Sequence, residues 1–199
     1  MKRKVLILIV GILFIIDAVF MQFGITKEID NNISLYFSLN NNNLLTSFFK
    51  FISFICSPKF MIIINAVLFI YIMLNKKYRL LIITLSSILS VIVNNLVKII
   101  VRRERPNFLR LVVESSYSFP SGHAMISVLF FGSIIYLINK SNIKYRKTIT
   151  LLLIIFIALV CISRIYLGVH YLTDVVGGVL MAIFIELILI DILERKKFI

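Results

Sequence analysis

Acidic residues, cysteines and flexible linkers are all scarce in this sequence of 199 residues. Nine aspartates and glutamates stand against 22 lysines and arginines, and no cluster of them suggests a site for a divalent metal. The two cysteines, Cys56 and Cys161, lie far apart in apolar surroundings, so we interpret both as small buried hydrophobic residues without a redox role. No internal repeat or low-complexity segment separates domains, so we expect residues 1–199 to form one helical domain.

Apolar residues, in contrast, are abundant. They make up 60% of the chain, and the mean hydropathy is +1.03, whereas a soluble domain is usually about half apolar. Runs close to the roughly 20 residues that cross a hydrocarbon core recur along the chain. The sequence therefore predicts an all-α integral membrane bundle of six transmembrane helices, at residues 5–25, 58–74, 80–101, 122–138, 149–162 and 171–190.

Two of these spans need comment. The first imitates a signal peptide, but its apolar stretch continues to Ile25 and no A-x-A cleavage site follows, so we expect a membrane helix. The fifth span is short and is expected to extend into its flanks.

The segment LLTSFFKFISFIC, residues 44–56, lies between the first two spans. Its polar residues Thr46, Ser47, Lys50 and Ser53 fall at helical spacing among apolar ones, a pattern that suits a helix lying in the membrane interface. An early start of the second span fits the same residues equally well.

The net charge of +13 comes from short basic clusters between the apolar spans. This distribution indicates membrane orientation and contact with anionic headgroups rather than binding to nucleic acid. With six crossings the clusters all fall on one side, which the positive-inside rule makes cytoplasmic together with both termini. The clusters are Lys2–Lys4, Lys76/Lys77/Arg79, Lys140/Lys144/Arg146/Lys147 and Arg195–Lys197.

The opposite, outer face gathers three unusual polar motifs. The first is KIIVRRERP, in which Lys98 and Arg105 are seven residues apart, so a continuous helix would place them on one face. Pro106 marks the exit into a loop. We interpret the neighbouring Arg102, Arg103 and Arg110 as basic anchors at the membrane surface.

The second motif is FPSGHA, residues 119–124, immediately before an apolar helix. Pro120 and Ser121 are typical of a helix start, whose free N–H groups attract phosphate. Gly122 would let an anion approach the backbone closely, and His123 would stand beside it. Alone, this motif is as consistent with a capped helix carrying an incidental histidine.

The third motif is SRIYLGVHYLTD, residues 163–174. Arg164 ends the fifth span, and His170 begins the sixth, four residues before Asp174 and therefore on the same helical face. A carboxylate in that position can accept the Nδ1–H of the imidazole and stabilise the ring when it becomes positive.

The chain has only two histidines, and both lie in these motifs. Two imidazoles, three cations and one carboxylate on one face favour phosphoryl transfer. In this hypothesis Lys98, Arg105 and Arg164 hold the phosphate, and His170 attacks phosphorus with Asp174 as its orienting partner. His123 serves as acid and base, and no metal or other cofactor is needed.

The three motifs together, K-x6-R-P, P-S-G-H and S-R-x5-H-x3-D, resemble those of the type 2 phosphatidic acid phosphatase superfamily. The resemblance covers residues 98–174 at motif level, and it implies the same roles for the six residues above. It also places Ser121 and Gly122 at positions that contact phosphate. Tyr117 and the stretch RPNF look similar to small bacterial members that act on phosphatidylglycerophosphate and polyprenyl diphosphates such as undecaprenyl diphosphate.

The resemblance implies an outward-facing lipid phosphatase in a bacterial plasma membrane, whose partners are its lipid substrate and the surrounding lipids. The motifs do not discriminate this enzyme from a phosphatase or phosphotransferase for soluble phosphate esters. A non-catalytic transporter or binder of anionic lipids is a third reading, although the paired repeats common in transporters are not evident. The sequence leaves the oligomeric state open.

Several polar residues lie outside the motifs. We expect Asn94 and Asn95 to form hydrogen bonds between helices, or to support Lys98. Of the intramembrane acids, Asp17 is expected to line a lipid groove and Glu186 to reach toward the inner interface. Glu104 and Glu114 are expected to temper the basic loop.

Overall fold

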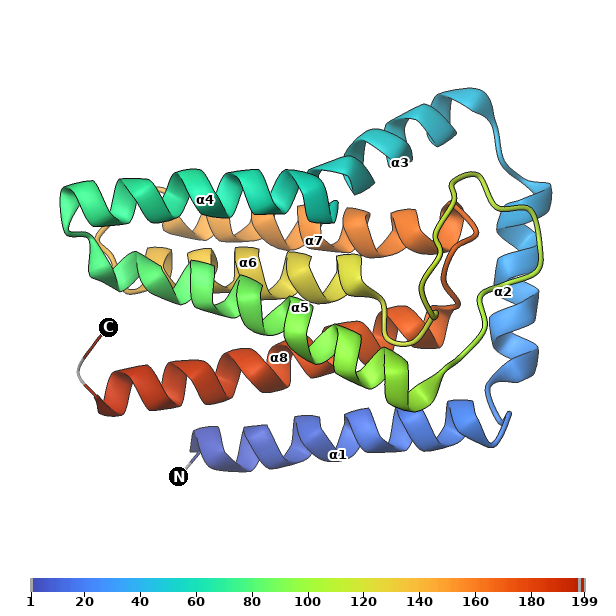
Figure 1. Ribbon diagram of the computed structural model, residues 1–199, viewed down its shortest axis with the longest axis horizontal. Helices are drawn as coiled ribbons and strands as arrows, with labels where there is room; N and C mark the ends of the chain where they lie inside the picture. Colours follow the sequence, from blue (N-terminus) through green and yellow to red (C-terminus); the bar gives the residue numbers. More distant parts are fainter. Residues whose placement is uncertain (1, 197, 199) are drawn as a thin grey trace.

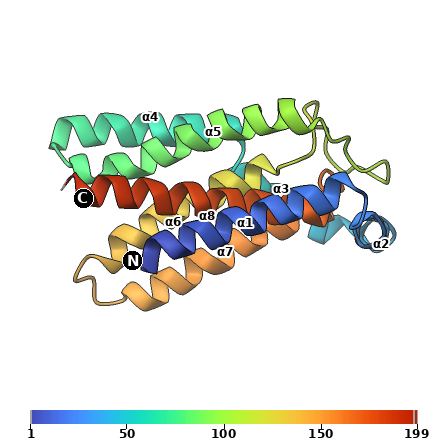
Figure 2. The same ribbon diagram turned by 90° about the horizontal axis from the view of Figure 1, so that it is seen from below.

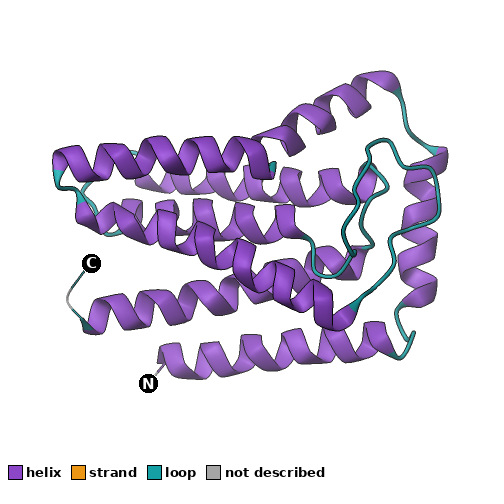
Figure 3. Cartoon of the chain, viewed as in Figure 1, coloured by secondary structure: helices purple, strands orange, loops and turns teal. Residues whose placement is uncertain are grey.

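The computed structural model describes residues 2–196 and 198, and within these residues the chain is helical without any strand (Figure 3). Within the described part of the chain, six helices are long and apolar enough to cross a membrane, which confirms the predicted all-α bundle. They are α1 (Lys2–Gln22), α4 (Pro58–Asn75), α5 (Leu81–Val101), α6 (Gly122–Asn139), α7 (Arg146–Tyr166) and α8 (Leu172–Arg195). As expected, the fifth span extends beyond residues 149–162 at both ends, and the 3-10 turn η1 (Tyr78–Leu80) leads into α5.

Helix α6 lies at the centre of the bundle and packs against α5, α7 and α8, while α1 packs along the outside of α8 (Figures 1 and 2). Gly178 allows α8 to lie close to the start of α6, because a Cβ atom there would lie 2.8 Å from the carbonyl oxygen of Ser121 and 3.2 Å from the Cβ of Ala124. Helix α4 is attached mainly to α5 and leaves most of its apolar side chains exposed to the surroundings. These exposed faces suit contact with lipid.

Two shorter helices, α2 (Lys27–Leu39) and α3 (Asn43–Ile55), join α1 to α4. Figure 1 shows α2 crossing one end of the bundle and α3 sloping from α2 toward α4. Asn42 caps α3 by accepting the N–H of Leu45 at 2.9 Å, and Ser57 and Pro58 start α4 afresh. The segment 44–56 is therefore a separate helix and not an early start of α4, whereas α2 was not predicted at all.

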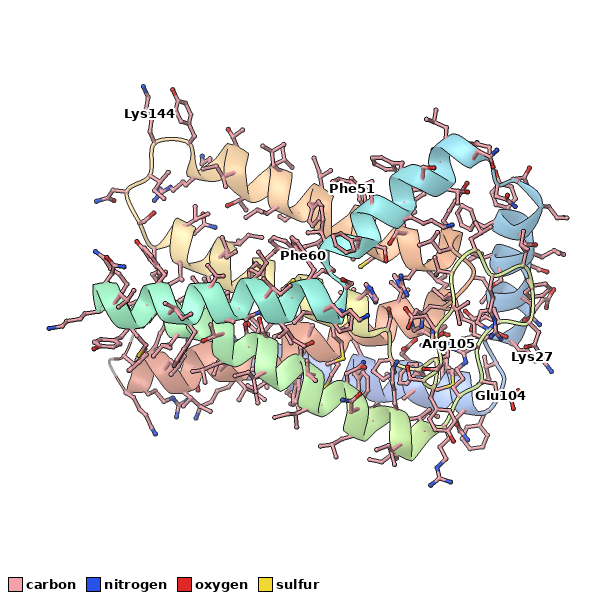
Figure 4. The ribbon with its side chains drawn as sticks, turned by 45° about the horizontal axis from the view of Figure 1, so that its top comes forward. Lys27, Phe51, Phe60, Glu104, Arg105 and Lys144 are labelled. Carbon is pink, nitrogen blue, oxygen red and sulfur yellow. The ribbon has the colours of Figure 1, made fainter. Side chains whose placement is uncertain are left out.

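Helix α3 is fixed to the bundle by aromatic side chains. The rings of Phe49 and Tyr166 lie 4.7 Å apart, and the hydroxyl of Tyr166 lies 3.3 Å from Thr46 Oγ1. At the corner between α3 and α4, the rings of Phe54 and Phe60 lie 5.2 Å apart, and Phe51 projects beside them (Figure 4). The end of α7 is thus held by a helix that comes more than 100 residues earlier in the chain.

The predicted basic clusters lie together at the end of the bundle that carries both termini, opposite the long loop of residues 102–121 (Figure 1). Figure 4 shows Lys144 at this end and Arg105 at the other. Lys197 of the last predicted cluster lies outside the described residues. The chain is thus a multi-pass membrane protein with its basic clusters at one end and its three motifs at the other.

Both intramembrane acids differ from expectation. Glu186 does not reach toward the interface; it is buried and accepts a hydrogen bond from Ser133 Oγ at 2.8 Å. Asp17 faces α8 rather than a lipid groove, since a Cβ atom at Gly177 would lie 2.8 Å from its Oδ2. The contact with Ser133 explains the orientation of Glu186, because burying a carboxyl group against a polar partner costs less than exposing it to hydrocarbon.

The connection between α7 and α8 depends on Gly168, which adopts a φ of +71° and lies so close to the 102–121 loop that a Cβ atom would sit 2.2 Å from the carbonyl oxygen of Leu109. We expect Gly168→Ala to lower the thermal unfolding midpoint in detergent by several degrees, since the left-handed conformation alone costs about 1–2 kcal/mol. Gly24→Ala, at a φ of +74° with open space around it, should lose only that conformational contribution. Gly132→Ala, inside α6 with no atom within 4 Å of the added Cβ, should leave the midpoint unchanged or raise it. Equal midpoints for all three variants would contradict a clash between the added Cβ at Gly168 and Leu109.

Candidate active site

The three sequence motifs meet at the end of the bundle crossed by α2. Lys98 lies in the last turn of α5, His123 in the first turn of α6 and Arg164 in the last turn of α7. Arg105 lies in the 102–121 loop, and His170 in the connection between α7 and α8. All five side chains are buried, so the loop and helix ends fold over them rather than leaving them in open water.

His170 and Asp174 are in contact, but not through the helical stacking that their spacing suggested. His170 precedes α8, which begins at Leu172, and its Nδ1 lies 3.4 Å from Asp174 Oδ2, longer than an ordinary hydrogen bond. Asp174 Oδ2 also accepts the backbone N–H of Tyr171 at 2.8 Å, which caps α8. The first turn of the helix therefore brings the carboxylate back to the imidazole.

The other partners of Asp174 are Ser118 and Arg103. The Ser118 hydroxyl donates to Asp174 Oδ2 and lies 3.5 Å from His170 Nδ1, and Arg103 Nη1 donates to Oδ1 at 2.6 Å. Arg103 was expected to be a surface anchor, and that prediction is wrong. Its guanidinium is drawn inward because two buried carboxylates, Asp174 and Asp30, need a cation.

Arg105 reaches His170 from the opposite side of the ring. Its Nη1 lies 3.2 Å from His170 Nε2 and donates to the carbonyl of Val169 at 2.7 Å. A guanidinium has only donors, so Nε2 must accept, and the proton of a neutral imidazole sits on Nδ1 toward Asp174. The Nε2 lone pair therefore faces a cation.

Lys98 and Arg105 share Ser116, whose hydroxyl accepts from Lys98 Nζ at 2.9 Å and from Arg105 Nη2 at 3.2 Å. The expectation that one continuous helix would align the two cations is wrong, because α5 ends at Val101 and Arg102 turns the chain at a φ of +51°. The cations converge because the loop folds back over the end of α5.

Arg164 is 2% exposed and is occupied by partners from two other segments. Its guanidinium donates to the hydroxyl of Ser53 in α3 and to Glu114 Oε1 at 2.5 Å. Glu114 thus neutralises one particular arginine and does not merely temper a basic loop. Arg164 is not among the residues that line the two cavities described below.

The start of α6 holds Ser121, Gly122 and His123 together. Ser121 is fully buried at the N-cap position, but its hydroxyl makes no capping hydrogen bond, and its N–H donates to the carbonyl of Asp174 at 2.8 Å. A Cβ atom at Gly122 would lie 3.0 Å from Asn94 Oδ1, and Asn94 donates to the carbonyl of Pro120 at 2.9 Å. Asn94 therefore bridges α5 to the start of α6, as expected for an interhelical hydrogen bond.

Two cavities open onto these residues. One, of about 460 Å³, has Lys98, Arg105, His123 and His170 at its polar end and continues between α4 and α5 along apolar side chains that include Met61, Ile62, Ile88 and Ile92. The other, of about 900 Å³, lies over the end of α5 and is lined by Arg103, Arg110, Glu104 and Tyr117. The two cavities share a polar wall, so the polar site sits between an apolar groove and a charged vestibule. The residues that line both are Asn95, Lys98, Arg105, Glu114 and Ser116.

Burial lowers the pKa of His170 to about 3, although hydrogen bonding and charge attraction from Asp174 act in the opposite direction. Burial also lowers the pKa of Arg105 from its ordinary value, whereas the carboxylates of Asp174 and Asp30 raise the pKa of Arg103 above it against the effect of burial. At neutral pH the site therefore holds a neutral His170 among charged arginines.

Sequence reasoning missed two charged residues of this network, Arg103 and Asp30. Arg103 Nη2 lies 2.7 Å from Asp30 Oδ2, and Asp30 lies in α2, the helix that was not predicted. The only sequence signal was an aspartate within a mixed polar stretch, which does not indicate burial.

Among the described residues, no group of three or more His, Cys, Asp or Glu side chains lies close enough together to hold a metal ion.

The fold and the site define an integral membrane protein in which cations surround two imidazoles at the end of an apolar groove. The chain belongs to the PAP2 superfamily, whose family model matches residues 79–198. It is therefore a membrane phosphatase of a superfamily whose enzymes are metal-independent.

Individual relatives agree with this assignment. Phosphatidylglycerophosphatase B of Bacillus subtilis is 42% identical over 90 residues, which cover 44% of this chain and 44% of that protein. Undecaprenyl-diphosphatase of Sulfolobus acidocaldarius is 29% identical over 201 residues, covering 96% of this chain and 92% of that protein. The crystal structure of a transmembrane PAP2-type phosphatidylglycerolphosphate phosphatase from Bacillus subtilis superposes with a TM-score of 0.85 at 27% identity, over 95% of this chain and 96% of that one.

The lowered pKa of His170 can be measured directly, because the chain contains only two histidines. In protein labelled at histidine, we expect the NMR signals of His170 to report a neutral ring with the proton on Nδ1 from pH 7 down to well below pH 6. The sign follows from burial, which disfavours the charged ring, so protonation requires more acid. The His123→Gln variant assigns the signals, and a His170 titration near pH 6.5 would refute the lowered pKa.

Proposed function

We propose that the protein hydrolyses the terminal phosphate of a lipid phosphate or lipid diphosphate at the outer face of a bacterial plasma membrane. The observation that carries this proposal is the continuity between the cationic site and the apolar groove between α4 and α5. A phosphate could lie against Lys98 and Arg105 while the lipid tail occupies the groove, which gives the substrate a polar end and an apolar end matched to the cavity.

We propose the following division of roles. His170 Nε2 attacks phosphorus, the bond to the leaving lipid oxygen breaks, and His123 gives that oxygen a proton. Asp174 stabilises the positive ring of the phosphohistidine. Water then attacks phosphorus while His123 removes its proton, the bond between phosphorus and His170 Nε2 breaks, and inorganic phosphate leaves with His170 neutral again. His170 is neutral at the start, as its lowered pKa favours.

Lys98, Arg105 and Arg164 bind the non-bridging oxygens in this proposal, with Ser121 and Gly122 near them at the start of α6. Arg164 becomes available when the phosphate replaces the carboxylate of Glu114, whose Oε1 lies 2.5 Å from Arg164 Nη2. Arg105 likewise exchanges its contact with His170 Nε2 for an oxygen of the phosphate, which frees the lone pair for attack. Residues 98–174 thus supply the chemistry within a single domain of residues 1–199.

Undecaprenyl diphosphate and phosphatidylglycerophosphate are the substrates that we rank first. Both combine a terminal phosphate with a long apolar tail, and both correspond to the names of similar proteins. The groove between α4 and α5 supports a lipid over a sugar phosphate, because a small soluble ester would leave its apolar walls empty.

The proposal is tested with purified protein and a panel of detergent-dispersed lipid phosphates alongside soluble sugar phosphates. We expect phosphate release from the lipids, a labelled phosphoprotein after rapid quenching, and loss of both signals by about 10⁴-fold or more in His170→Ala. Faster release from sugar phosphates would favour a phosphatase or phosphotransferase for soluble esters. Lipid binding without any release would favour a non-catalytic binder, and unchanged release by His170→Ala would refute the nucleophile.

The orientation is supported by the basic clusters, which lie at the end of the bundle opposite Arg105 (Figure 4). Asn107 and Lys144 are exposed at the two ends and suit labelling. An impermeant thiol reagent should modify Asn107→Cys in intact cells and Lys144→Cys only after permeabilisation. The reverse pattern would place the site on the cytoplasmic side.

A further inference from the structure

Arg103 joins two carboxylates that lie on different helices. Its Nη1 donates to Asp174 Oδ1 at 2.6 Å and to Thr173 Oγ1 at 2.7 Å, and its Nη2 donates to Asp30 Oδ2 at 2.7 Å. The guanidinium also lies 4.3 Å from the centre of the Tyr171 ring. This forked arrangement fixes the plane of the guanidinium, and through it the Asp174 carboxylate, from several directions.

Asp30 is held as firmly as its partner. It is 1% exposed, its Oδ1 accepts the backbone N–H of Thr173 at 3.1 Å, and its Oδ2 accepts the Thr173 hydroxyl at 2.6 Å. Helix α2 is thereby attached to the first turn of α8, one residue from Asp174. Asp30 lies outside residues 79–198, the part that matches the family model, so the superfamily motifs do not account for it.

The charges of this group matter as much as its geometry. Asp174 is the carboxylate nearest His170, but Arg103 sits against it and would cancel its charge if the two were alone. Asp30 shares Arg103, so the three side chains carry a net charge of about −1. A positive ring at His170, which the phosphohistidine requires, is then compensated inside a site with little water.

We propose that Asp30 and Arg103 are positioning residues of the active site, which orient the Asp174 carboxylate and set the net charge that His170 experiences. The proposal rests on the proposed function, in which His170 becomes positively charged during turnover. Neither residue needs to touch the phosphate. Helix α2, which crosses the end of the bundle in Figure 1, is accordingly part of the catalytic unit and not only a connection.

Other charged groups face the same pair and must be held constant in any test. Asp17 of α1 approaches from the side of Gly177, and Arg105 of the loop contacts His170 Nε2. The other charged or titratable groups near His170 are Lys98 of α5, His123 of α6 and Arg164 of α7. Ser118 donates its hydroxyl to Asp174. None of these is altered in the variants below.

The experiment compares Asp30→Asn, Arg103→Gln and the double variant in the full-length protein with dispersed lipid phosphate as substrate. Each single variant should lower kcat by about 10- to 100-fold through a misplaced Asp174, with KM changed by no more than about twofold. The acid limb of the pH profile of kcat, where His170 of the enzyme–substrate complex becomes protonated, should move in opposite directions in the two single variants. Asp30→Asn removes a negative charge, which disfavours the protonated ring and moves the limb to lower pH. Arg103→Gln removes a positive charge and moves the limb to higher pH.

The double variant restores the net charge of −1, so its acid limb should return close to that of the unaltered protein although kcat stays low. Arg103→Lys keeps the charge but loses the fork, and should show an unshifted limb with an intermediate kcat. Glu28→Gln on the same helix and Arg102→Gln beside Arg103 make the same charge changes at exposed positions, and both should behave as the unaltered protein. Thermal unfolding of each variant separates a folding defect from these effects.

Two results would overturn the inference while leaving the proposed function intact. One is a kcat for Asp30→Asn and Arg103→Lys equal to that of the Glu28 and Arg102 controls. The other is a fall in kcat without any opposite movement of the acid limbs, which a merely structural role would give. Phosphate release by His170→Ala at the rate of the unaltered protein would instead refute the nucleophile of the proposed function, on which the inference rests.

Discussion

Charge burial governs the design of this end of the bundle. Each ionised side chain that the site requires must leave water, and a lone charge in such a place is too costly to persist. In the structure the buried charges are paired. Asp174 contacts His170, Arg103 and the N–H of Tyr171 at once, and Arg164 forms an ion pair with Glu114. His170 itself is neutral at neutral pH, because burial lowers its pKa to about 3.

That arrangement explains why segments far apart in the sequence meet at one rim. Helix α3 supplies the hydroxyl of Ser53 to Arg164, the 102–121 loop supplies Ser116 and Ser118, and α2 supplies Asp30. In the proposed mechanism the three family motifs carry the reactive groups, and these additional segments orient them. The charged vestibule and the apolar groove meet at these residues, an arrangement that suits a phosphatase of membrane lipids.

The sequence predicted the six spans and the residues that gather in the site, because apolar run length and the rarity of histidine are local signals. It failed where contacts between distant segments decide the outcome. Arg103 and Arg105 look alike in the sequence, and it is the position of two buried carboxylates, Asp30 and Asp174, that turns Arg103 inward. The helical spacing offered for Lys98 with Arg105, and for His170 with Asp174, was also wrong in both cases, since a helix ends or begins between the paired residues.

The sparse attachment of α4 has a practical consequence. This helix forms one wall of the groove, yet it leans chiefly on α5 and presents most of its surface outward. In a bilayer, lipid chains pack against the exposed face of α4 and therefore help to hold this helix in place. The width of the groove between α4 and α5 then depends on the surrounding lipid or detergent as well as on the protein. Rates measured in different micelles or bilayers therefore describe different geometries of the same enzyme.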